Sequence, residues 1–270
     1  MQKLTSSQPI GIFDSGIGGL TIANALIEAL PQENIIYFGD TIHFPYGDKS
    51  QDAIRNYSHQ IAKWLIKQNC KMILIACSSA SAAAYETLKS ELHNQALLLN
   101  VIDPSVNFLV ANYGGKSIGL IGTKLTVGSN IYHKKIKELN PTIKLVSRAT
   151  PLITMAIEEG FYEHKVIEEI LPIYLSDEDF SAIDALVLSC THYPLIKNKI
   201  HNFYQQKIEV IDASKIVAEA AKELLQENNL LNTDTNAPKR AFYVSDYTTS
   251  FANSARMFFG SEINLLPINL

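Results

Sequence analysis

Short apolar runs recur along the chain, separated by longer stretches in which apolar positions follow the spacing of a helix. Each run is too short for a helix and lacks strict alternation of apolar and polar residues. Such runs predict strands that are buried on both faces. The nine predicted strands lie at residues 9–13, 34–38, 72–76, 97–102, 117–122, 143–147, 185–189, 208–211 and 240–245.

The intervening stretches are typical of amphipathic helices, most clearly at residues 50–68 and 214–228. Ser50 and Ser214 stand at the starts of these two helices, where a serine oxygen can cap free backbone N–H groups. Strands that alternate with helices predict an α/β protein with a mostly parallel sheet.

The residues that directly follow the apolar runs are candidates for a functional site. In parallel α/β sheets, ligands bind outside the carboxyl ends of the strands. Thiol, carboxylate, hydroxyl and imidazole groups gather at these positions. They comprise Asp14, Ser15, Gly16, Gly39, Asp40, Cys77, Ser78, Ser79, Asp103, Thr123, Cys190, Thr191, His192 and Asp212.

Two of these residues, Cys77 and Cys190, share one setting, because each ends an apolar run and precedes small polar residues. Backbone N–H groups at a helix start favour the thiolate, so we expect a lowered thiol pKa. The repeated pattern also predicts two similar α/β units that place the thiols on facing lips. His192 lies two residues after Cys190 and could serve as an acid or base. Cys70 precedes a strand and is expected to be structural.

Two other interpretations of these residues stay open. Cys77, Cys190 and His192 together could hold zinc, although the chain has no Cys-x-x-Cys pair to support a metal site. The glycine-rich stretch at 11–21, with Asp40 downstream, could bind a nucleotide. A dinucleotide fingerprint would require glycine where Thr21 stands.

Five further residues have both a functional and an ordinary interpretation. Asp14 follows the first predicted strand, and a carboxylate there can exchange protons with a nearby thiol. Tyr46 and Gly47 lie in a proline-containing loop that could line a pocket or be a simple turn. Glu158 and Glu159 precede Gly160 near a predicted helix end, where acidic residues are usually solvated.

Composition narrows the class of protein. The chain has 270 residues, of which 47% are hydrophobic, enough for one large domain or two smaller ones. Its net charge of −4 gives no reason to expect nucleic acid binding. No apolar run approaches the length of a membrane span or a signal peptide. The three cysteines make no disulfide framework, so we expect a cytoplasmic protein with reduced thiols.

Five short strings together resemble the glutamate racemases, a family of cofactor-independent amino-acid racemases. The strings are FDSGIGGL at 13–20, PYGDKS at 45–50, IACSSASA at 75–82, EEG at 158–160 and LSCTHYPL at 188–195. The resemblance implies two similar α/β domains with mostly parallel sheets, related by a pseudo-twofold axis, with the active site in the cleft between them. Residues 1–97 and 208–270 would form the first domain, which carries Cys77. Residues 98–207 would form the second, which carries Cys190.

The resemblance also implies an activity and a role for each matching residue. The enzyme would interconvert L- and D-glutamate without a cofactor, as a homodimer, and supply D-glutamate for peptidoglycan synthesis. Cys77 would deprotonate D-glutamate with help from Asp14. Cys190 would deprotonate L-glutamate with help from His192 and Glu158. The substrate would be held by Ser15, Tyr46, Gly47, Ser78, Ser79, Thr123, Thr191 and His192.

The chain departs from the family pattern directly after the first cysteine. The family usually has Asn-Thr there, whereas this chain has Ser78-Ser79. Ser79 can supply the threonine hydroxyl. Ser78 keeps one hydroxyl but lacks the two donors and the reach of an asparagine amide. Aspartate or a hydantoin therefore stays open as an alternative substrate.

Overall fold

The computed structural model describes residues 3–270, apart from the side chains at positions 250 and 253. The chain forms two sheets, and every pairing of neighbouring strands is parallel. The first sheet has the order β10 (Leu265–Pro267), β9 (Arg240–Val244), β2 (Ile35–Gly39), β1 (Ile10–Asp14), β3 (Met72–Ile75) and β4 (Leu97–Asn100). The second has the order β6 (Lys144–Ala149), β5 (Ser117–Gly122), β7 (Ala185–Ser189) and β8 (Glu209–Asp212).

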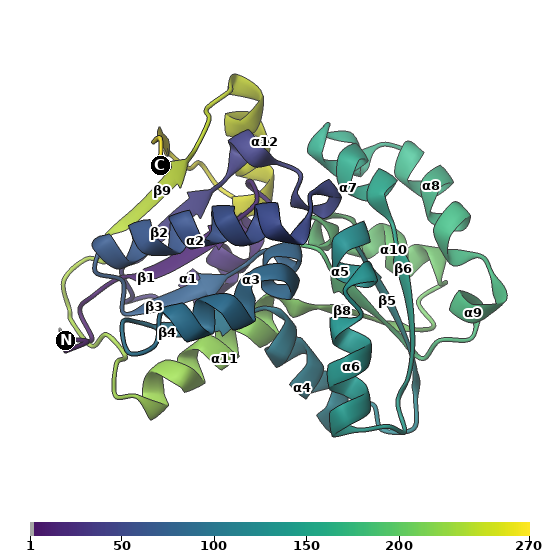
Figure 1. Ribbon diagram of the computed structural model, residues 1–270. Helices are drawn as coiled ribbons and strands as arrows, with labels where there is room; N and C mark the ends of the chain where they lie inside the picture. Colours follow the sequence, from purple (N-terminus) through teal and green to yellow (C-terminus); the bar gives the residue numbers. More distant parts are fainter. Residues whose placement is uncertain (1–2) are drawn as a thin grey trace.

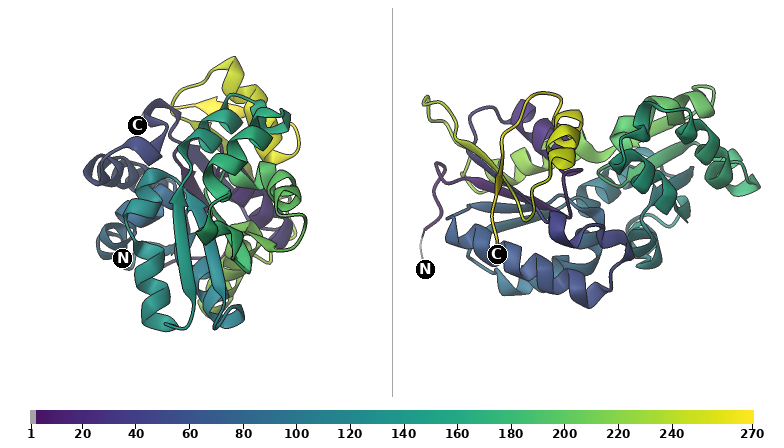
Figure 2. Two further views of the ribbon diagram at one scale, coloured as in Figure 1. Left: turned by 90° about the vertical axis from the view of Figure 1, so that its right-hand side faces the viewer. Right: turned by 90° about the horizontal axis from the view of Figure 1, so that it is seen from above.

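Helices cover both sheets (Figures 1 and 2). The described residues begin and end on the side of the first sheet. The α-helices are α1 (Leu20–Ala29), α2 (Gln51–Lys67), α3 (Ser78–Glu91), α4 (Ile102–Asn112), α5 (Lys124–Gly128), α6 (Ile131–Leu139), α7 (Pro151–Glu158), α8 (Val166–Leu175), α9 (Glu178–Ser181), α10 (Lys197–Phe203), α11 (Ala213–Glu227) and α12 (Thr249–Phe259). Short 3₁₀ turns are η1 (Thr41–His43), η2 (Tyr46–Asp48), η3 (Phe161–Glu163) and η4 (Tyr193–Ile196).

The predicted fold class is confirmed, because the chain forms two α/β units with parallel sheets. All nine predicted strands are present, and β1, β3 and β7 are buried at every position. The sequence pattern missed β10, a three-residue strand that ends in a proline and has only one buried residue. A strand that short and exposed produces no apolar run.

The two predicted helix caps have different outcomes. Ser50 caps α2 as expected, and its side chain accepts a hydrogen bond from the Ala53 N–H. Ser214 is not a cap, and that prediction is wrong. Helix α11 starts at Ala213, directly after β8, so Asp212 takes the capping position and accepts from the Ser214 N–H at 2.8 Å.

The sheets show where the chain passes from one α/β unit to the other. Strand β4 at 97–100 pairs in the first sheet, and β8 at 209–212 pairs in the second. Strand pairing shows which strands belong to each sheet, but it does not assign the helices to a domain. The domain limits at 98 and 208 therefore stay a prediction. One apolar cluster runs from β1 and β3 to β5 and β7. This shared core holds the carboxyl ends of both sheets near each other.

Candidate active site

The carboxyl ends of β1, β3, β5 and β7 open into one pocket between the two sheets. Its lining consists of Ser15, Phe44, Pro45, Tyr46, Gly47, Cys77, Ser78, Ser79, Thr123, Thr154, Cys190, Thr191 and His192. Both cysteines that the sequence singled out therefore reach the same space. The pocket is narrow, since a water molecule has only about 20 Å³ to move in. That is room for roughly one water molecule, so an amino acid requires the walls to separate.

Cys77 sits between the end of β3 and the start of α3. Its sulfur accepts a hydrogen bond from the Ala80 N–H at 3.5 Å and lies 3.6 Å from the Ser15 hydroxyl. Burial, followed by the nearby Asp14 carboxylate, raises the pKa of the Cys77 thiol to about 12. The expectation of a lowered pKa is thus wrong for Cys77. The backbone N–H and Ser15 do favour the thiolate, but burial outweighs them.

Asp14 lies behind Cys77, fully buried at the end of β1. Its Oδ2 accepts hydrogen bonds from the Gly16 N–H at 3.1 Å and the Gly19 N–H at 3.0 Å. The glycine-rich turn therefore wraps around this carboxylate, and these two N–H groups are not free for the phosphate of a nucleotide. Burial raises the pKa of Asp14 despite His192 and the surrounding N–H groups. Oδ1 has no hydrogen-bond partner among the described residues.

Cys190, His192 and Glu158 form a chain of contacts on the other side of the pocket. The Cys190 sulfur lies 3.7 Å from His192 Nδ1, and His192 Nε2 lies 2.6 Å from Glu158 Oε2. Burial lowers the pKa of His192, but the Glu158 carboxylate and the Cys190 sulfur together raise it well above its ordinary value. The raised pKa favours the imidazolium form of His192, in which both ring nitrogens carry a proton to donate. The solvated interpretation of Glu158 is wrong, since its side chain is only 9% exposed.

We expect the stability of the chain to depend on pH through His192. A group with a raised pKa stabilises the folded state below its ordinary pKa and loses this effect as pH rises through the folded value. Glu158→Gln removes the carboxylate that raises the pKa. We expect it to lower the free energy of unfolding by about 3 kcal/mol at pH 6. The loss shrinks as the pH rises through the raised pKa of His192, because the parent protein then loses the imidazolium as well.

Urea unfolding from pH 6 to pH 10 measures this difference. Glu91→Gln is the matched control, because Glu91 pairs with His59 where both side chains are about a third or more exposed. We expect that variant to change the free energy of unfolding by no more than about 1 kcal/mol. A loss in Glu158→Gln that is constant across the pH range would contradict the assignment of His192 as an imidazolium.

The loop after β2 forms the remaining wall. The Tyr46 hydroxyl donates to Asp40 Oδ2 at 2.6 Å, and the same carboxylate accepts from Ser245 at 3.0 Å and contacts His43 at 2.9 Å. Asp40 is therefore engaged in holding this loop and is not presented to a nucleotide ribose. Gly47 lies so close to the second unit that a Cβ there would stand 2.7 Å from Thr123.

Hydroxyl groups join the two units across the pocket. Ser79 Oγ, on α3, lies 2.8 Å from Thr123 Oγ1, which caps α5. Thr21 Oγ1, on α1, donates to the Thr191 carbonyl at 3.2 Å. Among the described residues, the Ser78 hydroxyl makes no hydrogen bond, although Ser78 lines the pocket. Its hydroxyl is thus available to a ligand.

The structure brings the predicted residues together and adds three. Asp14 and Glu158 are not among the lining residues; Asp14 lies behind Cys77, and Glu158 lies behind His192. The residues that the sequence did not indicate are Phe44, Pro45 and Thr154. Phe44 lies against His192, with 5.8 Å between ring centroids. Thr154 lies inside α7, and nothing in its local sequence distinguishes it from a core residue.

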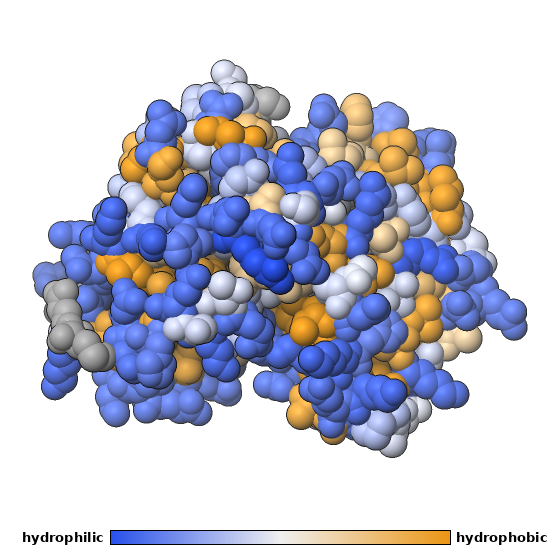
Figure 3. Space-filling model, viewed as in Figure 1, coloured by the Kyte–Doolittle hydropathy of each residue, from blue (hydrophilic) through white to orange (hydrophobic). Residues whose placement is uncertain are grey.

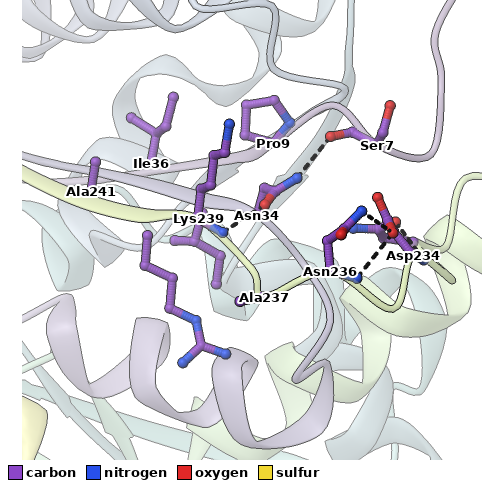
Figure 4. A pocket seen from close by; sticks show the side chains of 12 residues that line it. Ser7, Pro9, Asn34, Ile36, Asp234, Asn236, Ala237, Lys239 and Ala241 are labelled. Carbon is purple, nitrogen blue, oxygen red and sulfur yellow. Dashed lines mark hydrogen bonds between the residues drawn. The ribbon is translucent and has the colours of Figure 1, made fainter.

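A larger cavity lies at the opposite ends of the strands (Figure 4). It measures about 720 Å³ and is lined mainly by the starts of β2 and β9 and by residues 232–239. Asn34 donates to the Ser7 carbonyl there, and Asn236 bonds to Asp234. Its lining residues include neither cysteine nor histidine. Size alone therefore does not identify the functional site.

Over residues 3–270, no helix combines the length and apolar character that crossing a bilayer requires.

Comparison with known proteins gives one consistent result. Residues 19–221 match the family Asp/Glu/Hydantoin racemase. The chain is 40% identical to the glutamate racemase of Neisseria meningitidis serogroup B, over 99% of this chain and 98% of the relative. It is 39% identical to that of Chlorobaculum parvum, over 97% and 96%. Among solved structures, the glutamate racemase of Francisella tularensis in complex with D-glutamate superposes with a TM-score of 0.91, at 38% identity and 98% coverage of both chains.

Proposed function

The chain belongs to the Asp/Glu/Hydantoin racemase family, and we propose that it interconverts L- and D-glutamate by proton transfer between two cysteines. The observation that carries the proposal is that Cys77 and Cys190 line one narrow pocket, each with its own acid–base partner. Similarity to glutamate racemases over nearly the whole chain supports the choice of substrate.

Racemisation removes the α-proton from one face of the substrate and returns a proton to the other face. Two groups on opposite sides of the α-carbon can do this without moving around it. One cysteine acts as the thiolate base and the other as the thiol acid, and the roles exchange in the reverse direction. We propose that Cys77 deprotonates D-glutamate and Cys190 deprotonates L-glutamate.

The two sides of the pocket differ in how they stabilise a thiolate. At Cys190, the imidazolium of His192 provides a positive charge beside the sulfur, and Glu158 keeps that imidazole protonated. At Cys77, burial opposes the thiolate and the neighbouring group is Asp14. The raised pKa of Asp14 lets it carry a proton, and we propose that it assists Cys77 in that form.

The α-proton is a weak acid, so the site must also stabilise negative charge on the substrate carboxylate. Hydroxyl and N–H donors fixed in a water-poor pocket can provide this stabilisation. We propose that Ser15, Ser78, Ser79, Thr123 and Thr191, with Tyr46, Gly47 and His192, hold the substrate. Ser79 and Thr123 now bond to each other, so binding has to separate this pair and widen the pocket.

A racemase assay tests the proposal directly. Purified protein is incubated with D- or L-glutamate without added cofactor, and the optical signal is followed by circular dichroism. We expect both reactions to approach the racemate. Aspartate and a hydantoin are assayed in parallel, because Ser78 departs from the family pattern and keeps both as alternative substrates. A clear preference for aspartate or for the hydantoin would refute glutamate as the substrate. No turnover of any of the three compounds would refute the proposed racemase activity.

We propose further that the D-glutamate serves peptidoglycan synthesis, in the cytoplasm, and that the enzyme is a homodimer. The similarity to bacterial glutamate racemases supports the first two points. Apolar side chains exposed on the second unit, Leu152, Phe161 and Ile173, offer a surface for association, and Figure 3 shows apolar residues over α7 and α8. Sedimentation velocity measures the assembly.

A further inference from the structure

Thr154 places a hydroxyl group beside the sulfur of Cys190. It lies on the inner face of α7, is 6% exposed and lines the pocket. Its Oγ1 is 3.8 Å from Cys190 Sγ and 3.2 Å from the Tyr193 hydroxyl. These are the two partners within hydrogen-bonding distance among the described residues. The hydroxyl proton of Thr154 can therefore be donated either to the Cys190 sulfur or to the Tyr193 oxygen.

The hydrogen bonds that Tyr193 makes with Thr150 determine whether Tyr193 also needs the hydroxyl proton of Thr154. The Tyr193 hydroxyl donates to the Thr150 carbonyl at 3.1 Å and lies 2.6 Å from Thr150 Oγ1. Thr150 Oγ1 also lies 3.4 Å from the Gly122 carbonyl, but its contact with Tyr193 is shorter, so Thr150 can satisfy the Tyr193 hydroxyl as both donor and acceptor. Tyr193 then has no need of Thr154, because its oxygen already accepts a proton. The proton of Thr154 is left available to the sulfur.

The two cysteines have matching surroundings when Thr154 is included. The sulfur of Cys77 is near one hydroxyl, from Ser15, and one N–H, from Ala80. The sulfur of Cys190 is near one N–H, from His192, and one hydroxyl, from Thr154. A reaction that uses each thiolate in turn needs donors at both sulfurs. Without Thr154, Cys190 would depend on His192 alone.

We propose that Thr154 is a catalytic residue whose hydroxyl donates a hydrogen bond to the Cys190 thiolate. When Cys190 has taken the α-proton from the substrate, its S–H donates to Thr154 Oγ1 instead, and the hydroxyl proton turns to Tyr193. No proton is lost or gained by Thr154 in this exchange. The importance of this bond for turnover rests on the proposed function, whereas the bond itself does not.

Alkylation of Cys190 measures the effect on the sulfur without requiring racemase activity. Iodoacetamide reaches the sulfur when the pocket walls separate and reacts with the thiolate, so the alkylation rate as a function of pH follows ionisation. Mass spectrometry of the Cys190 peptide separates this thiol from Cys70 and Cys77. The other titratable groups near Cys190 are His192, Tyr193 and Cys77, with Glu158 and Asp14 beyond them. Tyr132 and Asp212 share a second small pocket with Cys190. All of these groups are unchanged in the variants below.

Thr154→Val keeps the shape of the side chain and removes the hydroxyl. We expect the midpoint of the Cys190 alkylation profile to move up by about one pH unit, the usual effect of a hydrogen bond to a charged group. Thr154→Ser keeps the hydroxyl and should retain the parent profile. Met155→Ala, at a 41% exposed position of the same helix, is the control for disturbance of α7. Thr154→Ala provides a second removal of the hydroxyl if the valine variant folds poorly.

Two results would overturn the inference. One is a Thr154→Val profile identical to that of the parent, and the other is a Thr154→Ser profile displaced as far as that of valine. Racemase turnover is measured separately, and we expect kcat/KM of Thr154→Val to fall about 10-fold near neutral pH. A parent protein without turnover, but with the expected alkylation shift, would refute the proposed function and leave the hydrogen bond standing.

Discussion

Cys77→Ala and Cys190→Ala are each expected to lower kcat/KM for both glutamate enantiomers by about 10⁴-fold, the upper range for loss of a general acid or base. Each variant keeps one thiol, but one thiol cannot both remove and return a proton on opposite faces. Enantiomers have equal free energies, so the equilibrium constant is unity and the loss must be equal in both directions. Circular dichroism of the reaction mixture measures both rates.

Cys70→Ala is the control for these variants. Cys70 is buried in the apolar cluster beneath β1 and β3, away from the pocket lining. Burial raises the pKa of the Cys70 thiol to about 12, and Cys70 does not reach the space that holds Cys77 and Cys190. We expect this variant to lose some stability and to keep its turnover. Full racemase activity in either Cys77→Ala or Cys190→Ala would refute the two-cysteine mechanism.

The serine variants separate the two half-reactions. In Cys190→Ser, the Cys77 thiolate remains, and we expect it to exchange the α-hydrogen of D-glutamate with solvent deuterium while L-glutamate exchanges far more slowly. Cys77→Ser should show the reverse preference. Proton NMR in D₂O follows the α-hydrogen signal of each enantiomer. Equal exchange of both enantiomers in one variant would contradict the assignment of each cysteine to one face.

The fold could be predicted from the sequence because its strands are buried on both faces. A strand such as β7, with five buried residues, needs a continuous apolar run, and that run is visible in the sequence. The same logic explains the failure at β10, where two of three residues are exposed and no run is required. The cap of α11 was misplaced for a related reason. The pattern shows that a helix follows β8, but Asp212 and Ser214 are both good caps and only the backbone decides between them.

The site residues that lie at strand ends could be predicted from the sequence. Asp14, Cys77, Thr123 and Cys190 all follow apolar runs, and parallel strands carry them to one edge. Thr154 has no such signal, because it lies in the middle of α7 and reaches Cys190 only through tertiary packing. The prediction of a lowered pKa for Cys77 was wrong for a physical reason. A helix start is visible in the sequence, whereas the depth of burial, which dominates here, depends on the closure of both units.

Gly18→Ala is expected to lower kcat/KM about 100-fold, because it pushes the two sides of the pocket apart. A Cβ at Gly18 would stand 2.6 Å from Cε1 and Nδ1 of His192 and from Thr191 Oγ1. His192 cannot easily move away, since Glu158 holds its Nε2 at 2.6 Å and Phe258 packs against its ring at 5.1 Å between centroids. The turn that carries Gly18 must shift instead. A displacement of about 1 Å can cost a catalytic site about 10²-fold in rate.

The shift would reach the chemistry through the groups on both sides of Gly18. The next residue, Gly19, donates to Asp14, and Thr21 bonds to both the Gly18 and the Thr191 carbonyls. The added methyl group therefore disturbs the partner of Cys77 and the partner of Cys190 together. We expect kcat to fall more than KM rises. We also expect the free energy of unfolding to fall by about 1–3 kcal/mol, the usual effect of overpacking.

Gly128→Ala is the matched control, since a Cβ at that position would meet no heavy atom within 4 Å. Gly128 lies at the end of α5, where alanine favours the helix by up to about 1 kcal/mol, so this variant should be as stable as the parent or slightly more stable. Steady-state kinetics and urea unfolding of both variants distinguish a local clash from a general effect of losing a glycine. Parent-like kcat/KM in Gly18→Ala would show that the two units can separate at this contact without cost, and that closure around His192 does not position the thiols.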